Sequence, residues 1–340
     1  MTPDFNRLPH QGIRDLAPYI PGKSEEELAQ ERGLTDILKL ASNENPLGCS
    51  PLVHKALTGL TPKQMSTYHV SSQHPLRETL AQRLNLEKDN VMLSNGSDLI
   101  FHLLLMCFAV HQDKHILTHD YAFISYEIQA KTIGVTTRKT PLKANWQVDI
   151  DAMIQACTEK TALIFIANPN NPTGVSVPPS DLERLLAHIP QTTLLILDEA
   201  YHEYLPAYEQ TDLNARLEKH KNLVITRTFS KAYGLAALRL GYACAHPEIV
   251  ALLYRIQLPF AVNLAAMTAG QAALEDDAFL DKTLQTNQTG LGWMAHALTT
   301  LGLNFIPSVC NFITVHCPCD AQLIDQSLQA QGVIIRPLTP

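Results

Sequence analysis

Charged side chains are scarce in this sequence. Lys, Arg, Asp and Glu together make up 17% of the 340 residues, whereas hydrophobic residues make up 46%. This composition excludes a disordered or fibrous chain and indicates a well-buried globular protein. Acidic residues outnumber basic ones by 33 to 26, which gives a formal net charge of -7. That balance favours neither a nucleic acid nor an anionic membrane surface as a partner.

Long apolar runs and a regular cysteine pattern are also missing. The longest apolar run, Leu103 to Val110, is too short to span a bilayer, and residues 1–16 lack the apolar core of a signal peptide. The seven cysteines are odd in number and scattered, which predicts reduced thiols in a cytoplasmic protein. Neither the pair Cys317 and Cys319 nor the 14 histidines have the spacing of metal ligands, so we expect no metal site.

Between residues 75 and 244, short apolar runs alternate with helical patterns. Continuous apolar strands separated by helices predict an α/β fold, with a mostly parallel sheet covered by helices on both faces. The expected strands are 91–93, 115–117, 163–166, 194–197 and 223–225. The expected helices are 75–84, 98–110, 121–132, 149–157 and 180–188.

The two ends of the chain predict a second, smaller lobe. Ser24 followed by Glu27 forms a capping box, which predicts that a helix begins there. Further expected elements are strands at 37–40, 312–315 and 333–336, a long helix at 277–302 and a helix near 320–331. The length suits one large domain and one smaller one. We expect the large domain to span 41–275 and a small α+β domain to combine 1–40 with 276–340.

Polar residues follow the expected strands. Ligands of parallel α/β sheets bind at the carboxyl ends of the strands, so these residues are the candidates for a site. The polar segments are Ser94–Ser97, Asn168–Pro172, Asp198–Tyr201 and Ser230–Lys231.

Lys231 and Asp198 are the two charged residues at these strand ends that need an explanation. Lys231 lies among small residues just past a buried strand, where desolvation would lower its pKa and make the amine a nucleophile. The alternative is an ordinary loop lysine. Asp198 ends an apolar strand, where a buried carboxylate needs a partner. The alternative is an exposed N-cap of the next helix.

An anion site is predicted where Asn95, Gly96, Ser97 and Asp98 begin a helix, because free N–H groups and the helix dipole favour negative charge there. Ordinary N-capping is the alternative. Further phosphate contacts could come from Thr228, Ser230 and Arg239, although Arg239 could equally form a structural ion pair. A Schiff-base lysine, an aspartate for a pyridinium nitrogen and an anion-binding helix end are the parts that hold pyridoxal 5'-phosphate (PLP).

Three segments resemble the signatures of the fold-type I PLP-dependent aminotransferases. They are Asn168-Pro-Asn-Asn-Pro-Thr-Gly174, Asp198-Glu-Ala-Tyr201 and Thr228-Phe-Ser-Lys-Ala-Tyr-Gly-Leu-Ala-Ala-Leu-Arg-Leu-Gly241. Two more, Leu40-Ala-Ser-Asn-Glu-Asn-Pro-Leu-Gly48 and Ser94-Asn-Gly-Ser-Asp98, are similar to those of the histidinol-phosphate aminotransferases within that group. The resemblance runs from about Tyr19 to Arg336. It implies that the large domain binds PLP.

The resemblance implies a role for each matched residue. Lys231 would bind PLP covalently and move the proton between the substrate and the cofactor, and Asp198 would pair with the pyridine nitrogen. Asn171 and Tyr201 would hydrogen-bond the 3'-oxygen of the ring, and Phe123 would stack on the ring. The residues implied to hold the cofactor phosphate are Gly96, Ser97, Thr228, Ser230 and Arg239. The residues implied to contact the substrate are Tyr19, Asn43 and, at its anionic end, Arg336.

The resemblance also implies a homodimer, in which Tyr68 reaches the PLP phosphate of the partner subunit. The sequence departs from the family pattern in three places. Phe123 stands where Tyr is common, residues 69–74 replace a Pro and an Asp, and a second substrate-binding arginine is expected beyond the last residue.

The implied function is transamination between the pair histidinol phosphate/imidazole acetol phosphate and the pair glutamate/2-oxoglutarate, in histidine biosynthesis. Two other functions of the same fold stay open, an aromatic amino-acid aminotransferase and a threonine-phosphate decarboxylase. A non-catalytic PLP-binding regulator is disfavoured, because the sequence has no basic DNA-binding extension. An inactive relative that keeps the fold is the last alternative, and bound PLP with turnover of glutamate would exclude it.

Overall fold

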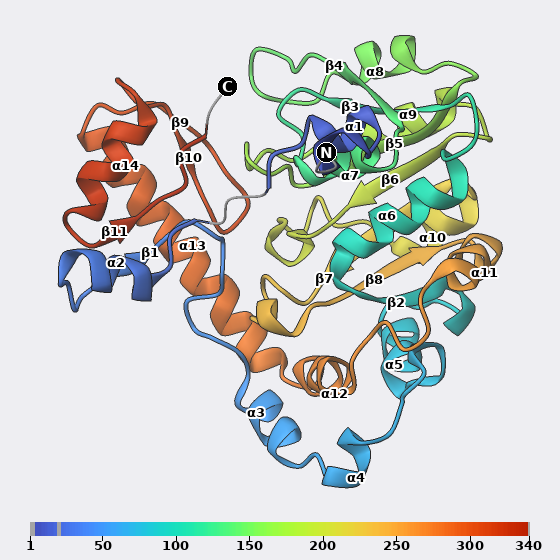
Figure 1. The fold of residues 1–340 in the computed structure, drawn as a ribbon, viewed down its shortest axis with the longest axis horizontal. Helices are drawn as coiled ribbons and strands as arrows, with labels where there is room; N and C mark the ends of the chain where they lie inside the picture. The colour runs from blue at the N-terminus through green and yellow to red at the C-terminus, as the bar shows by residue number, and fades with distance from the viewer. Residues whose placement is uncertain (1–3, 19–21, 339–340) are drawn as a thin grey trace.

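The computed structural model describes residues 4–18 and 22–338 and shows two lobes joined by one long helix (Figure 1). The large lobe is built on a sheet of seven strands in the order β2-β8-β7-β6-β5-β3-β4. The strands of this sheet are β2 Val91–Asn95, β3 His115–His119, β4 Thr136–Thr140, β5 Thr161–Ala167, β6 Leu194–Asp198, β7 Leu223–Thr228 and β8 Leu240–Ala245. Every neighbouring pair is parallel except the two pairs that β8 makes. The mostly parallel α/β sheet predicted from the sequence is confirmed.

All five predicted strands of the sheet are present, but β4 and β8 were not predicted. β4 reads Thr-Thr-Arg-Lys-Thr, a polar edge strand with mostly exposed side chains. It lacks the apolar run that marks a buried strand. β8 is fully buried but antiparallel to both neighbours and rich in small residues, so its pattern is weak.

Helices cover both faces of the sheet, as the alternation of strands and helices predicted. One hydrophobic core lies against α3, α5, α8, α9, α10 and α12, and the other lies against α6, α7 and α11. Successive strand residues point to opposite cores: Leu195 and Leu197 lie in the first, Leu194 and Ile196 in the second. This period of two explains why strands buried on both faces read as continuous apolar runs.

Five helices of the large lobe, α5 to α9, lie within a few residues of the predicted bounds, whereas no bounds were predicted for α3, α4, α10, α11 and α12. Their bounds are α3 Pro51–Thr58, α4 Pro62–Met65, α5 Pro75–Arg83, α6 Gly96–Phe108, α7 Ser125–Thr132, α8 Ile150–Ala156, α9 Pro179–His188, α10 Leu213–Lys219, α11 Pro247–Ile256 and α12 Leu264–Ala273. Short 3₁₀ helices lie at Phe5–Arg7, Ser71–Gln73, Lys88–Asn90, His202–Tyr204 and Ala236–Leu238. Within the described residues, no helix is long and apolar enough to cross a membrane.

The small lobe is reached through the 24-residue helix α13 (Asp277–Thr300), the long helix that the sequence predicted. Its other elements are α2 Glu25–Arg32, β1 Leu38–Lys39, β9 Phe305–Ile306, β10 Thr314–Val315, α14 Ala321–Gln329 and β11 Val333–Ile334. β1 pairs in parallel with β11, so two segments far apart in the sequence, near residues 38 and 333, meet in this lobe. The capping box of Ser24 and Glu27 is present at the start of α2.

The first helix, α1 (Gln11–Arg14), lies beside α7 of the large lobe (Figure 1). The ring nitrogen Nε2 of His10 is 3.0 Å from the carbonyl oxygen of Thr132, and a Cβ added to Gly12 would collide with the carbonyl of Lys131. This contact concerns residues that the sequence assigned to the small domain. The division into 41–275 and 1–40 with 276–340 stays a prediction.

Candidate active site

Lys231 and Asp198 follow neighbouring parallel strands. Asp198 is the last residue of β6 and is paired in register with Thr226 of β7, and Lys231 lies three residues beyond the end of β7. The Lys231 Nζ lies 5.7 Å from the ring centroid of Tyr201 and donates to the carbonyl of Ser42 at 3.4 Å. Burial lowers the pKa of Lys231 below its ordinary value. The lysine therefore lies in the interior of the site and not among solvated loop lysines.

Asp198 is buried, with 3% of its surface exposed, and so the N-cap alternative is wrong. Its Oδ2 accepts a hydrogen bond from Tyr126 Oη at 2.7 Å, and its Oδ1 accepts one from Thr226 Oγ1 at 3.2 Å. Burial raises the pKa of Asp198 to about 7, and the hydrogen bond from Tyr126 opposes this effect. A nearby cation that takes the remaining acceptor positions of the carboxylate would stabilise its ionised form.

Tyr201 brings two other predicted residues to the same place. Its hydroxyl oxygen accepts from the side-chain amide of Asn43 at 3.0 Å and from that of Asn171 at 3.1 Å. Asn43 comes from the loop after β1, and Asn171 follows β5, so three distant segments meet at one hydroxyl. Burial raises the pKa of Tyr201, which keeps the hydroxyl protonated.

The N-terminus of α6, where an anion site was predicted, forms a cradle with the guanidinium of Arg239. Asn95, at the N-cap position, directs its side-chain amide to the carbonyl of Ala261 and does not cap the helix. Gly96 has a φ of +72°, and a Cβ placed on it would lie 2.7 Å from Arg239 Nη2. The ordinary-capping alternative is therefore wrong for Asn95. The first N–H groups of α6 lie next to a guanidinium, which suits a phosphate.

Three more predicted residues complete this cradle. Thr228 Oγ1 donates to Ser230 Oγ at 3.0 Å, and Arg239 Nη1 donates to Ser230 Oγ at 3.4 Å. Ser97 lies close by, because a Cβ on Gly241 would lie 2.6 Å from the Ser97 backbone nitrogen. Arg239 Nη2 is also 3.8 Å from Asp98 Oδ2, so the alternative of a structural ion pair applies to it as well.

The remaining predicted residues lie around this centre in different ways. Phe123 is half-buried, with its ring edge-on to Tyr126 at a centroid distance of 5.7 Å. Tyr68 is 80% exposed and stacks on Phe260 at 4.4 Å. Arg336 approaches residue 22, where an added Cβ would lie 3.9 Å from its Nη1. Tyr19 lies outside the described residues.

Sequence reasoning missed the residues that hydrogen-bond Asp198 and the segment around Lys231. Tyr126 and Thr226 hold the two oxygens of Asp198. Asn45 donates its side-chain amide to the carbonyl of Ala232, the residue after Lys231, at 2.9 Å. The segment 121–132 was predicted to be a helix, and its residues 125–132 form one, but nothing in its pattern shows that one hydroxyl faces β6. Only the strand order brings these groups together.

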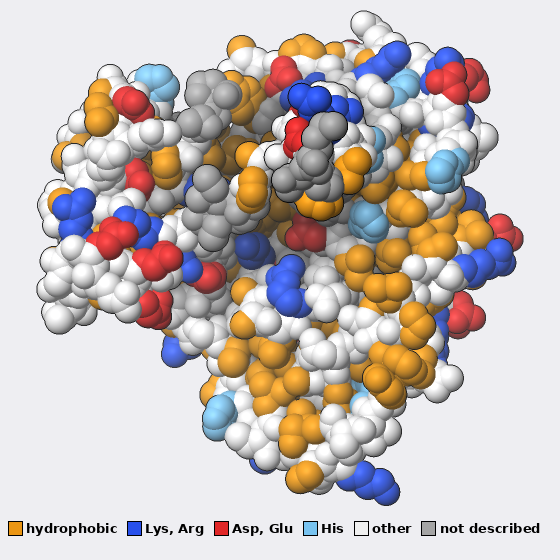
Figure 2. Space-filling model, viewed as in Figure 1, with side chains coloured by type: hydrophobic (Ala, Val, Ile, Leu, Met, Phe, Trp, Pro, Cys, Tyr) orange, Lys and Arg blue, Asp and Glu red, His pale blue; other side chains and the backbone are white. Residues whose placement is uncertain are grey.

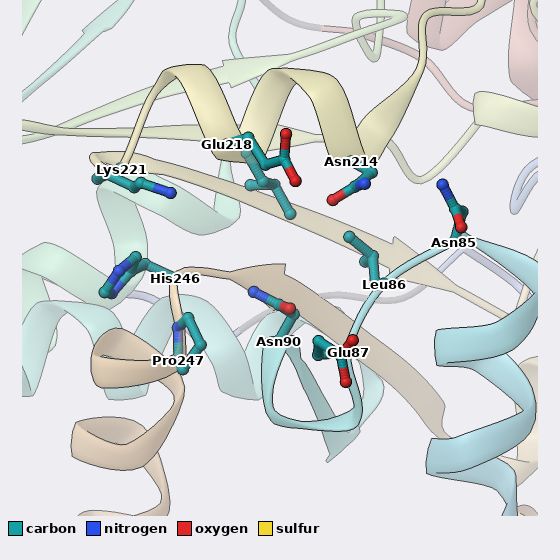
Figure 3. A pocket seen from close by; sticks show the side chains of 10 residues that line it. Asn85, Leu86, Glu87, Asn90, Asn214, Glu218, Lys221, His246 and Pro247 are labelled. Atoms are coloured by element: carbon teal, nitrogen blue, oxygen red, sulfur yellow. The ribbon is translucent and has the colours of Figure 1, made fainter.

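A separate pocket of about 430 Å³ lies at the opposite end of the strands, where β2 begins and β8 ends. Figure 3 shows side chains from α10, from the segment between α5 and β2 and from the turn between β8 and α11 around it. Its lining residues are Asn85, Leu86, Glu87, Asn90, Asn214, Leu217, Glu218, Lys221, His246 and Pro247. None of the predicted site residues is among them, so this pocket is distinct from the centre around Lys231. Within the described ranges, no cluster of His, Cys, Asp and Glu side chains could hold a metal ion.

Known proteins are similar to this chain in sequence and in fold. Residues 35–340 match the family model of the class I and II aminotransferases. Histidinol-phosphate aminotransferase 2 of Legionella pneumophila (strain Lens) is 50% identical over 99% of this chain and 92% of that protein. Histidinol-phosphate aminotransferase 1 of Mannheimia succiniciproducens is 40% identical over 98% of this chain and 90% of that protein.

A solved structure extends the likeness to three dimensions. Histidinol-phosphate aminotransferase from Sinorhizobium meliloti, in complex with pyridoxal-5'-phosphate, superposes with a TM-score of 0.87 at 25% identity, covering 97% of this chain and 89% of that one. The chain therefore belongs to the class I and II aminotransferases and, within them, to the histidinol-phosphate aminotransferases. The family resemblance and the fold predicted from the sequence are confirmed.

Proposed function

We propose that this protein is a PLP-dependent histidinol-phosphate transaminase, which exchanges an amino group between histidinol phosphate and 2-oxoglutarate in histidine biosynthesis. The observation that carries the proposal is the meeting of Lys231, Asp198 and Tyr201 at the carboxyl ends of adjacent parallel strands. The relatives at 50% and 40% identity carry the name of that activity.

The side chains present fit PLP. A phosphate suits the uncapped N–H groups of α6 and the guanidinium of Arg239. A protonated ring nitrogen suits Asp198, whose buried carboxylate receives only hydroxyl donors among the side-chain contacts of the described chain. An aldehyde suits the Lys231 amine, because burial lowers its pKa and so raises the neutral, nucleophilic fraction. We therefore assign the cofactor phosphate to Gly96, Ser97, Thr228, Ser230 and Arg239.

When bound, PLP supplies a ring that delocalises the negative charge left on the substrate after loss of its α-proton. Asp198 keeps the ring nitrogen protonated, which strengthens that effect. The Lys231 amine removes the α-proton of the substrate as a general base. As a general acid, it then returns a proton to the C4' atom of the cofactor. Asn171 and Tyr201 hydrogen-bond the 3'-oxygen of the ring, and Phe123 covers one face of it.

The substrate lies between the lobes in this proposal. The side-chain amide of Asn43 donates to Tyr201. The backbone carbonyl oxygen of Asn43 accepts a hydrogen bond from the side-chain amide of Asn311 at 2.9 Å. Asn43 therefore connects the cofactor site with the segment before β10. Arg336, after β11, binds the anionic end of the substrate. Tyr19, which lies outside the described residues, is assigned a substrate contact by the family resemblance alone. Figure 2 shows a hollow between the two lobes, with basic and acidic side chains side by side at its edge.

The working unit in this proposal is a cytoplasmic homodimer. Exposed hydrophobic side chains support the dimer: Tyr68 is 80% exposed, Leu258 77% and Met65 65%. Tyr68 stacks on Phe260, which is also partly exposed. Figure 2 shows that hydrophobic side chains gather over α5 and α12 on the face that also carries the hollow. Tyr68 of one subunit reaches the PLP phosphate of its partner. Sedimentation should therefore give twice the mass of 37.7 kDa.

The test of the function is an amino-acceptor panel with the purified chain and added PLP. We expect imidazole acetol phosphate to be converted at least tenfold faster, in kcat/KM, than phenylpyruvate, with glutamate as donor. Faster conversion of phenylpyruvate would assign the chain to the aromatic aminotransferases. Release of carbon dioxide from threonine phosphate would assign it to the decarboxylases.

The role of Lys231 has its own test. Lys231→Ala should abolish turnover and the absorbance band of covalently bound PLP, because the amine that binds the cofactor is lost. Lys221→Ala, at an exposed lysine after α10, is the matched control and should leave both unchanged. Full activity in Lys231→Ala would refute the proposed function.

A further inference from the structure

Tyr126 is the buried tyrosine in contact with Asp198. It lies in the first turn of α7, is 0% exposed, and donates its hydroxyl to Asp198 Oδ2 at 2.7 Å. The distance is that of a strong hydrogen bond to a charged acceptor. The bond joins α7 on one face of the sheet to the carboxyl end of β6.

The ring of Tyr126 is held on several sides. It stacks on Phe165 of β5, with centroids 4.9 Å apart and planes inclined by 22°, and it meets the ring of Phe101 of α6 edge-on at 5.0 Å. Its other edge contact is Phe123, at 5.7 Å and 82°. Aromatic contacts of this kind fix ring orientation, so the hydroxyl is aimed at Asp198 by packing as well as by the hydrogen bond.

The hydrogen bond favours the ionised form of Asp198. Burial raises the pKa of this carboxyl to about 7, while donation from Tyr126 lowers it. Burial also raises the pKa of Tyr126 well above its ordinary value, so the phenol stays protonated and remains a donor. Thr226 supplies the second donor, at 3.2 Å to the other oxygen.

Other charged and titratable groups act on the same carboxyl. Asp98 of α6 raises the pKa of Asp198. Lys231, after β7, and Tyr201, after β6, are electrostatically coupled to it. The hydroxyl of Tyr126 makes the shorter of the two side-chain hydrogen bonds to Asp198, at 2.7 Å against 3.2 Å from Thr226, so its removal is the most direct way to change the charge of Asp198.

We propose that Tyr126 is a positioning residue for the cofactor site: its hydroxyl keeps Asp198 anionic, and it thereby keeps this carboxylate aimed at the ring nitrogen of PLP. The first half of this proposal is a property of the chain itself. The second half rests on the proposed function, because it needs PLP to be bound between Asp198 and Phe123.

The test compares Tyr126→Phe with Tyr242→Phe in the full chain. Tyr126→Phe removes the hydroxyl and keeps the ring. Tyr242, a buried tyrosine of β8 that packs near Phe229, makes Tyr242→Phe the matched control. Without PLP, the infrared band of the protonated Asp198 carboxyl is followed against pH and is identified by its loss in Asp198→Asn. With PLP, the dissociation constant is measured by titration of the apo-protein.

Tyr126→Phe should move the infrared midpoint of Asp198 up by about one pH unit and weaken PLP binding about tenfold, since one pKa unit corresponds to a factor of ten. Tyr242→Phe should change neither. If Tyr126→Phe does not fold, Thr226→Val should move the midpoint in the same direction by a smaller amount.

The infrared titration and the PLP titration distinguish failure of the Tyr126 proposal from failure of the proposed function. An unchanged infrared midpoint in Tyr126→Phe overturns the proposal for the carboxylate. A shifted midpoint with unchanged PLP affinity overturns its extension to the cofactor. If the wild-type chain binds no PLP at all, the proposed function fails, while the infrared arm still decides whether Tyr126 controls Asp198.

Discussion

The side-chain amide of Asn45 donates to Thr283 Oγ1 at 3.1 Å, although 238 positions separate the two residues. The same amide donates to the carbonyl of Ala232 at 2.9 Å. Asn45 therefore connects three parts of the molecule: the loop after β1, the residue next to Lys231, and the helix α13 that leads to the small lobe. One side-chain amide thus bonds both to the lysine segment and to the helix α13.

Asn45→Ala should lower the free energy of unfolding by about 1–3 kcal/mol, because a buried carbonyl and a buried hydroxyl lose their partner. Urea denaturation measures this change. Asn145→Ala is the control, since Asn145 is exposed and bonds only within its own turn, and it should change stability by less than about 0.5 kcal/mol. Equal effects of the two substitutions would show that the Asn45 contacts contribute nothing.

Gly96→Ala should damage the phosphate cradle specifically. Gly96 and Gly33 both have a positive φ, +72° and +68°, so an alanine at either position costs about 1 kcal/mol in backbone strain. An added Cβ meets nothing within 4 Å at Gly33, but at Gly96 it meets the Arg239 guanidinium at 2.7 Å.

Both glycine variants should therefore lose similar stability in a thermal melt, and only Gly96→Ala should also weaken PLP binding, by about tenfold or more. Fluorescence titration with PLP measures the affinity. Tight PLP binding by Gly96→Ala would contradict the assignment of this helix end to the phosphate.

The stability of the PLP-free protein should depend on the charge of Asp198. Its pKa is raised from 3.8 to about 7, so the native state binds more protons than the unfolded state between these values. Stability from this group is thus complete at low pH and is lost as the pH rises through the folded value. A shift of roughly three units corresponds to on the order of 4 kcal/mol.

Asp198→Asn removes this titration. The variant should be more stable than the wild type at pH 8, by urea denaturation without PLP, and the difference should shrink as the pH falls towards 4. Addition of saturating PLP should reverse the order at pH 8, because the cofactor supplies the missing positive charge. A difference that does not change with pH would exclude Asp198 as its source.

An ion pair between Glu199, the residue after β6, and Arg227 of β7 connects these two strands beside the site. Arg227 donates from Nε and Nη2 to Glu199 Oε2 at 2.8 and 2.7 Å, and both side chains are buried. Burial opposes ionisation of Glu199, but the charges of Arg227, His202 and Arg216, together with the hydrogen bond from Arg227, lower its pKa. Arg227→Met should destabilise by about 3–5 kcal/mol, because it leaves a buried carboxylate without its main partner.

The double variant Arg227→Met with Glu199→Leu should recover much of that loss, because apolar side chains can replace a buried ion pair. Urea denaturation of the single and double variants gives the coupling energy. Additive losses in the double variant would show that the two side chains do not act as a pair.

The strands and helices were predictable where one local pattern decides them. Apolar runs marked β5 and β6, since a strand buried on both faces has mostly apolar side chains on both of them. β4 and β8 were not predicted, because an edge strand and a strand of small residues give weak patterns. The residues of the candidate site were suggested by type and by resemblance, and their roles stay predictions.

The sequence by itself determined the class of fold, the family and the identity of the residues that could hold PLP. Those properties depend on periodicity, composition and short motifs, all of which are local. Only the tertiary structure decided that Tyr126 faces Asp198 and that Asn45 reaches Thr283. These contacts depend on strand order and on how α7 and α13 pack against other elements, and neither is encoded in any one stretch of the chain.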